Sequence, residues 1–91
     1  MKKVFIVTHG YLDRDGRIDA QTWAFESDER AKWWVRELLT DFEGNLIAGW
    51  SWRDREGETA IAEMLKYLSN GHTLRKDDDS ECVVVKECDI V

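Results

Sequence analysis

Two histidines, His9 and His72, are the side chains of this chain that are best able to move a proton near neutral pH. A histidine that acts as a general base needs a nucleophile to deprotonate and a partner that orients its ring. Neither histidine stands at a spacing that supplies both. The chain also has no glycine-rich phosphate loop, no Gly-x-Ser-x-Gly elbow and no His-Glu-x-x-His motif. The sequence therefore favours a protein that is not an enzyme, and no cofactor is expected.

A cluster of aspartates around Gly16 is similar to the middle of a calcium-binding EF-hand loop. When Gly16 is aligned with the glycine of that loop, Asp13 and Asp15 fall on ligand positions. However, Tyr11 occupies the first ligand position, and Thr22 stands where a bidentate glutamate belongs. We therefore expect a hairpin turn here, with Asp13, Asp15 and Asp19 as weak candidates for cation ligands, and no metal site is assigned.

A second acidic cluster places four negative charges in five residues: Asp77, Asp78, Asp79 and Glu81. A metal site needs carboxylates that converge, whereas the side chains of consecutive residues diverge. A solvated turn is the expected structure, and its charge discourages pairing between sheet edges. An acidic patch that engages a basic protein surface is the functional alternative.

Five tryptophans among ninety-one residues are the most unusual feature of the composition. Trp34 shares a helical phase with the apolar residues around it, and Trp23 lies in a predicted strand, so both are expected in the core. Trp33 falls on the charged side of the same helix. It is either an exposed anchor for a protein partner or covered by the segment that carries Trp50 and Trp52.

The elements that must position these residues follow from periodicity. Apolar alternation and apolar runs predict strands over 3–11, 18–25 and 81–89. Residues 46–52 form either a short strand or an ordered loop, and residues 72–76 are a possible edge strand. The Asp-Gly pair before the second strand indicates a tight turn, and therefore an antiparallel hairpin with the first strand.

Two helices are expected between the strands. Ser27 and Asp54 are candidate N-caps, and apolar residues at helical spacing predict helices over about 28–42 and 55–69. The first helix is expected to end before Gly44, which suits the left-handed conformation that follows a helix. Residues 1–91 thus read as a single small α+β domain in the order β-β-α-(β)-α-(β)-β, with a mostly antiparallel sheet of three to five strands.

The first and last strands are apolar on both faces, so both faces of the sheet are expected to need a covering layer. Two helices packed side by side cover only one face of a sheet. Either the helices lie on opposite faces, or the open face meets a partner or a second copy of the chain. A homodimer through an apolar sheet face is therefore one expectation.

Composition and cysteine usage exclude several classes of protein. Thirteen basic and nineteen acidic residues give a net charge of −6, which argues against a nucleic-acid binder. No apolar run approaches the ~18–20 residues that span a bilayer, and the apolar run after Lys3 is too short for a signal peptide. Cys82 and Cys88 would lie about 20 Å apart in one strand, beyond disulfide reach. Two unpaired thiols favour a cytoplasmic protein.

The leading functional hypothesis is a non-catalytic, acidic protein-binding module, an adaptor or an inhibitor, similar in size and charge to many phage and mobile-element products. Its expected contacts are three aromatic anchors and an acidic rim: Trp33, Trp50, Trp52, Asp77, Asp78, Asp79 and Glu81. The alternative is a small-ligand or cation-binding domain that uses the tryptophan cluster or the Asp13–Asp19 loop. A small hydrolase that uses His9 or His72 is the third hypothesis.

Overall fold

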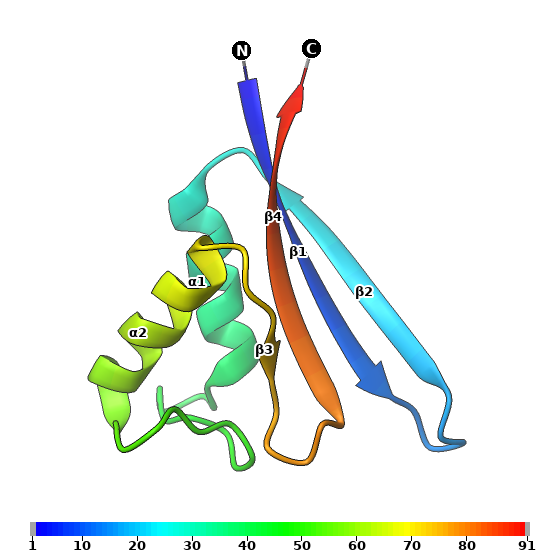
Figure 1. Cartoon of the computed structure of the whole chain (residues 1–91), viewed down its shortest axis with the longest axis vertical. Helices are drawn as coiled ribbons and strands as arrows, with labels where there is room; N and C mark the ends of the chain where they lie inside the picture. The colour runs from blue at the N-terminus through cyan, green and yellow to red at the C-terminus, as the bar shows by residue number, and fades with distance from the viewer. Residues whose placement is uncertain (1, 91) are drawn as a thin grey trace.

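The chain forms one antiparallel sheet and two helices in a computed structural model, which describes residues 2–90 (Figure 1). The sheet order is β2-β1-β4-β3, and every neighbouring pair is antiparallel. This confirms the α+β class and the predicted order of elements. The elements in chain order are β1 (Lys2–Leu12), β2 (Ile18–Phe25), α1 (Asp28–Leu39), α2 (Gly57–Ser69), β3 (Leu74–Arg75) and β4 (Glu81–Ile90).

The hairpin between β1 and β2 forms where the sequence predicts it. Asp13 organises the turn, because its Oδ1 accepts hydrogen bonds from the backbone N–H groups of Asp15 and Arg17, each at 2.9 Å. Gly16 adopts a φ of 76°, which a residue with a side chain rarely reaches. The uncertain segment 72–76 contains a strand, the two-residue β3. The other uncertain segment, 46–52, is a loop held by the isolated bridges Thr40–Leu46 and Trp52–Arg55.

Both helices lie on the same side of the sheet, as Figure 1 shows. α1 packs on β1 and β2, while α2 packs on β4 and β3. The core lies between these two layers, and its fully buried members include Val7, Val83 and Leu39. The possibility that the helices take opposite faces is therefore wrong.

The first helix is shorter than its apolar periodicity predicts. Ser27 caps it as expected, since its Oγ accepts a hydrogen bond from the Arg30 N–H at 3.1 Å. The helix ends at Leu39 rather than near residue 42, and Phe42 is 97% exposed. Asp41 stops it, because its Oδ1 accepts the N–H groups of Glu43 and Asn45 and so stabilises a turn in place of another helical turn.

The second helix also begins later than predicted. Glu56 rather than Asp54 occupies the N-cap position, and its side chain makes no capping hydrogen bond. Gly57, at a φ of 60°, opens the helix. The loop before α2 is therefore longer than the periodicity of the apolar residues predicts.

Leu39 and Phe42 test the observed end of α1. Replacing the fully buried Leu39 with alanine should lower the free energy of unfolding by about 2–5 kcal/mol, because the cavity forms in the core. Phe42→Ala should change it by less than about 0.5 kcal/mol, since the ring lies in solvent. Urea unfolding of the two variants measures both values. Equal losses would mean that the helix continues through Phe42 and buries its ring.

Candidate functional site

One face of the sheet is left without a covering layer. Residues directly opposed in antiparallel strands share a face, so the observed register assigns every strand residue to one side or the other. The set opposite to the helices is called the outer face, and its uncharged members are Val4, Ile6, Thr8, Gly10 and Leu12 of β1, Ile18, Ala20, Thr22 and Ala24 of β2, and Cys82, Val84, Cys88 and Ile90 of β4.

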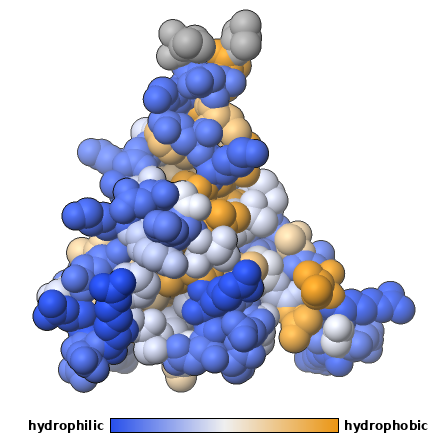
Figure 2. Space-filling view, in the orientation of Figure 1, coloured by the Kyte–Doolittle hydropathy of each residue, from blue (hydrophilic) through white to orange (hydrophobic). Residues whose placement is uncertain are grey.

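The outer face is largely apolar, and its residues range from partly exposed in the centre of β1 and β4 to fully exposed along β2 and at the strand ends. Whereas Val7 and Val83 on the inner face are fully buried, Ile18 is 85% exposed, and Leu12 and Ile90 are also exposed. Figure 2 shows hydrophobic surface along the strands and again at the tip of the β1–β2 hairpin, at the lower right. Within residues 2–90, none of the residues that form the core or pack against it belongs to the outer face.

Charge is divided unequally between the two faces. The acidic residues within the described strands all belong to the inner side: Asp19, Glu81, Glu87 and Asp89. The outer side carries cations, since Lys86 is opposed to Ile6, Lys2 to Ile90, and Arg75 to Cys82. In a chain with a net charge of −6, the outer-face positions of the described strands therefore include no acid, although Asp79 borders the face beside Leu12 and Ile18.

At the β4 edge the outer face continues into a hollow of about 550 Å³. β3 pairs only with Cys82 and Val83, so the edge of β4 beyond them has no neighbouring strand. The hollow is lined by Ile6, Val84 and Lys86 of the outer face, by residues 69–71 at the end of α2, and, around the strand edge, by Val85 and the acidic Glu87 of the inner side. The unpaired edge and the apolar face thus form one continuous surface.

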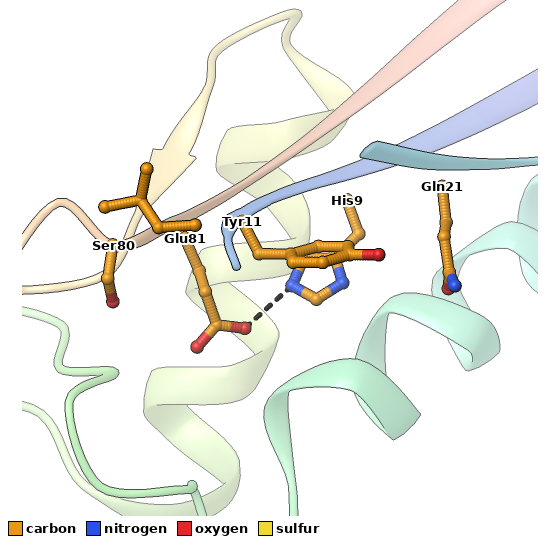
Figure 3. Close-up of a pocket in the computed structure, with 6 residues that line it drawn as sticks. His9, Tyr11, Gln21, Ser80 and Glu81 are labelled. Atoms are coloured by element: carbon orange, nitrogen blue, oxygen red, sulfur yellow. Dashed lines mark hydrogen bonds and ion pairs between the residues drawn. The ribbon is translucent and has the colours of Figure 1, made fainter. Parts of the chain in front are cut away.

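A polar site lies on the inner side, towards the hairpin end of β1 and β2, where the strands diverge from the helices (Figures 1 and 3). His9, Tyr11, Gln21, Ser80 and Glu81, with Leu12, line a hollow of about 440 Å³. The His9 Nε2 lies 2.7 Å from the Glu81 Oε1, as the dashed line in Figure 3 marks.

The groups of this site mainly satisfy one another. Lys76 Nζ donates to the other carboxylate oxygen of Glu81 at 2.5 Å, and Lys76, His9 and Glu81 are all largely shielded from solvent. The two hydroxyls that line the hollow are bonded elsewhere, Ser80 to Asp78 and Tyr11 to Asp19. His9 thus has an orienting carboxylate, but neither hydroxyl is placed as a nucleophile.

Glu81 is ionised more readily than a free glutamate. Burial on its own raises the pKa of its carboxyl, but hydrogen bonds and charge from Lys76 and His9 outweigh burial and lower the pKa below the usual 4.5. The folded state therefore favours the carboxylate. Its contribution to stability is present above about pH 4.5 and is lost as the pH falls through the lowered pKa.

Replacing Glu81 with glutamine should lower the free energy of unfolding by about 1–3 kcal/mol near neutral pH, because Lys76 and His9 both lose a charged acceptor. The difference from the wild type should shrink as the pH falls below about 4.5, because the wild-type carboxyl itself becomes protonated as the pH passes through its lowered pKa. Chemical unfolding across this pH range measures it. Glu37→Gln, on the exposed side of α1, is the control; a loss that stays constant with pH would contradict the role given to the Glu81 charge.

The division of the five tryptophans into buried and exposed residues differs from the one expected from the sequence. Trp33 is 54% exposed, so the segment 46–52 does not cover it. Trp50 is only 5% exposed and belongs to the core, and the expectation that it is a surface anchor is wrong. Its loop folds inward, where the ring fills space beside the helices. Trp52 is half-buried against Tyr67, with ring centroids 5.0 Å apart.

Trp34 and Trp23 lie at the core as predicted. Their rings meet edge to face at 5.0 Å, and Phe25 lies 6.5 Å from Trp34. Both rings are only partly buried. The predicted trio of anchors is therefore reduced to Trp33 on the helical side and part of Trp52, and these two residues lie on α1 and in the loop before α2.

Trp33 and Trp34 are adjacent in sequence but differ in burial, which makes them a matched pair. Trp34→Ala should cost about 3–5 kcal/mol of stability, because it removes the ring that packs on Trp23 and Phe25. Trp33→Ala should cost less than about 1 kcal/mol. Thermal or urea unfolding separates them, and a large loss in Trp33→Ala would place this ring in the core.

The two acidic clusters do not converge on a common point. Asp77 accepts a hydrogen bond from Ser51, Asp78 accepts two from Ser80, and Glu81 points to the inner hollow. Asp13 is occupied by its own turn. Within residues 2–90 no group of three or more histidine, cysteine or acidic side chains is arranged to hold a metal ion.

The chain was compared with protein-family models, with curated proteins and with solved structures, and none of them matches it. Neither α1 nor α2, the helices of the described residues, has the length and apolar character needed to cross a bilayer.

Proposed function

We propose that this protein is a non-catalytic protein-binding module and that the outer face is its binding surface. The observation that carries the proposal is the uncovered, largely apolar face of β2, β1 and β4, whose strand positions within residues 2–90 include no acid. Burial of apolar surface is the main driving force of protein association. A folded chain that leaves such a face open retains this driving force for a partner.

The size of the outer face is suited to this role. Three strands spaced by about 4.8 Å and about ten residues long give a surface of roughly 14 Å by roughly 33 Å, or about 460 Å² in projection. The largest apolar patch of an ordinary monomer covers about 300–600 Å² and is often functional. The outer face lies within that range, and its flanking cations favour a partner with acidic groups around an apolar centre.

The other candidate surfaces support binding less well. Trp33 lies on α1, on the side of the sheet away from the outer face, and is a single exposed ring. The polar groups of the inner hollow already pair with one another through Glu81, which leaves little for a ligand to satisfy. The acidic turn at Asp77–Asp79 remains exposed and is available as a rim that steers an approaching protein.

A cytoplasmic location is part of the proposal. Cys82 and Cys88 are both free thiols and both lie on the outer face. Free thiols persist in reducing compartments, whereas secreted domains of this size commonly pair theirs. Their position also makes them reporters, because a protein that covers the outer face shields both sulfur atoms from thiol reagents.

Ala24 and Ala62 provide a matched test, since both are exposed alanines, one on the outer face and one on α2. A lysine at position 24 places a charge within the proposed interface and should weaken binding at least about tenfold, whereas Ala62→Lys should leave binding unchanged. The immobilised chain is exposed to native-host lysate, and the captured protein is identified, purified and titrated by calorimetry against all three chains. Equal affinity for Ala24→Lys and the wild type would contradict the proposal.

A further inference from the structure

We infer that the free edge of β4 is a docking site for an extended segment of a partner protein, which adds to the sheet as a further strand. This inference goes beyond the proposed function, because the site binds through backbone groups at an edge rather than through the apolar outer face. The chain itself uses the first part of the edge in this way, since β3 pairs with Cys82 and Val83. From Val84 onward, no strand within residues 2–90 lies beside β4 on that edge.

The hydrogen-bonding groups of the free edge follow from the bonds on either side of β4. In an antiparallel pair, alternate residues direct both their N–H and their C=O toward the same neighbour. The Leu12 N–H donates to the Ser80 carbonyl on the β1 side at 3.1 Å, and the Lys76 N–H donates to the Glu81 carbonyl on the β3 side at 2.9 Å. Even-numbered residues of β4 therefore face β1, and odd-numbered residues face the edge. Backbone donors and acceptors without a strand partner are thus presented by three residues: Val85, Glu87 and Asp89.

A hollow lies on each side of this edge, where the side chains of an added strand would fall. Alternate residues of a strand point to opposite sides, and strand addition gains its specificity from pockets that receive them. On the outer side is the hollow of about 550 Å³ beside Val84 and the end of α2. On the inner side is a second hollow of about 330 Å³, called the helix-side pocket. The lining of the helix-side pocket is partly apolar and partly acidic, and it includes Phe5, Leu68, Val85, Asp28 and Glu87.

Acidic residues dominate the helix side of the free edge. Glu87 and Asp89 are exposed on the edge strand itself, and Asp28 lies across the helix-side pocket. Lys3 and Lys32 form ion pairs with Glu87 and Asp28, but pairs this exposed contribute little in water. The helix side of an added strand should therefore carry lysine or arginine. The aliphatic stems of these residues can pack on the apolar part of the pocket while their charged ends meet the carboxylates.

A second copy of this chain is not suited to the free edge. Two β4 edges that pair antiparallel about a two-fold axis at Glu87 oppose this glutamate to itself and Val85 to Asp89. Like charges that are directly opposed in a sheet destabilise the pairing. The occupant is therefore a segment of opposite charge, in which basic residues alternate with small apolar ones. Its apolar side chains face Ile6 and Val84 on the outer side.

Peptides of identical charge test the inference on the whole wild-type chain. The parent peptide is Thr-Lys-Val-Lys-Val-Lys-Thr, amidated at its C-terminus and labelled with a fluorophore at its N-terminus. Titration by fluorescence anisotropy in about 0.15 M salt should give a dissociation constant below about 500 µM. The peptide with glutamate in place of each lysine should bind at least about tenfold more weakly.

Methylation of alternate peptide nitrogens separates strand addition from attraction by charge. In an antiparallel strand whose lysines oppose Val85, Glu87 and Asp89, the lysine N–H groups face β4 and the valine N–H groups face solvent. N-methylation of two lysines should therefore weaken binding at least about tenfold, because two hydrogen bonds to the edge are lost. N-methylation of the two valines should change the affinity by less than about threefold, since neither group faces β4.

Glu87→Lys and Glu43→Lys are matched variants, because both replace an exposed glutamate and only one of them lies at the edge. Glu87→Lys should weaken binding of the parent peptide at least about tenfold, and Glu43→Lys by less than about threefold. Circular dichroism verifies that both variants fold. Hydrogen exchange of the wild type, followed by NMR, locates the peptide. The amides of Val85 and Asp89 should exchange more slowly when it is bound, whereas the amide of Thr22 at the opposite edge of the sheet should not change.

Equal affinity for the two methylated peptides overturns the inference, because charge alone then accounts for binding. A parent peptide that does not bind below about 500 µM, or that binds Glu87→Lys as tightly as Glu43→Lys, also overturns it. A wild type that sediments as a dimer and fails to bind the peptide assigns the edge to a second copy, which is equally contrary to the inference. The proposed function fails by a separate result, namely a captured host protein whose affinity for Ala24→Lys equals its affinity for the wild type.

Discussion

The pairing of β1 with β2 on one side and β4 on the other is the interaction on which the rest of this structure depends. It extends over nearly the full length of β1, and it joins the N-terminal hairpin to the C-terminal strand. Once both registers are set, alternation along each strand assigns every side chain to one of two faces. The helices cover one of them, and the remaining face must be stable in water or bound by another molecule.

The polar hollow lies where the helices and the sheet diverge. Figure 1 shows the two layers splaying apart towards the β1–β2 hairpin. There the inner side carries His9, Tyr11 and Glu81 in place of aliphatic residues, and Lys76 reaches Glu81 from the strand connection. This polar cluster closes the open end of the core.

The outer face has no such substitution of polar for apolar residues. Its centre is valine, isoleucine, threonine and glycine, and its flanks are alanine, cysteine and a few cations. The absence of acidic residues from the outer-face positions of the described strands, in an acidic protein, distinguishes this face from the inner one. The proposed protein-binding role of the outer face is consistent with both its composition and its accessibility.

Several features of the fold could be predicted from local sequence, whereas the end of α1 and the burial of Trp50 could not. The β1–β2 hairpin followed from the aspartates and glycine of its turn, the start of α1 from Ser27, and the two-sided apolar character of β1 from its run of residues 4–7. The end of α1 did not, because Phe42 continues the apolar period while Asp41 diverts the backbone. The burial of Trp50 also escaped prediction, since no periodicity exists in a loop.

The sequence by itself determined the elements, their approximate limits and the alternation of side chains along the strands, because these depend on residues close together in the chain. Only the tertiary structure decided that both helices lie on one face, that Trp50 turns inward and that His9 meets Glu81 across 72 positions. Those outcomes depend on contacts between distant segments, whose geometry is set by the packing of layers. The same packing decided which side of the sheet remained open.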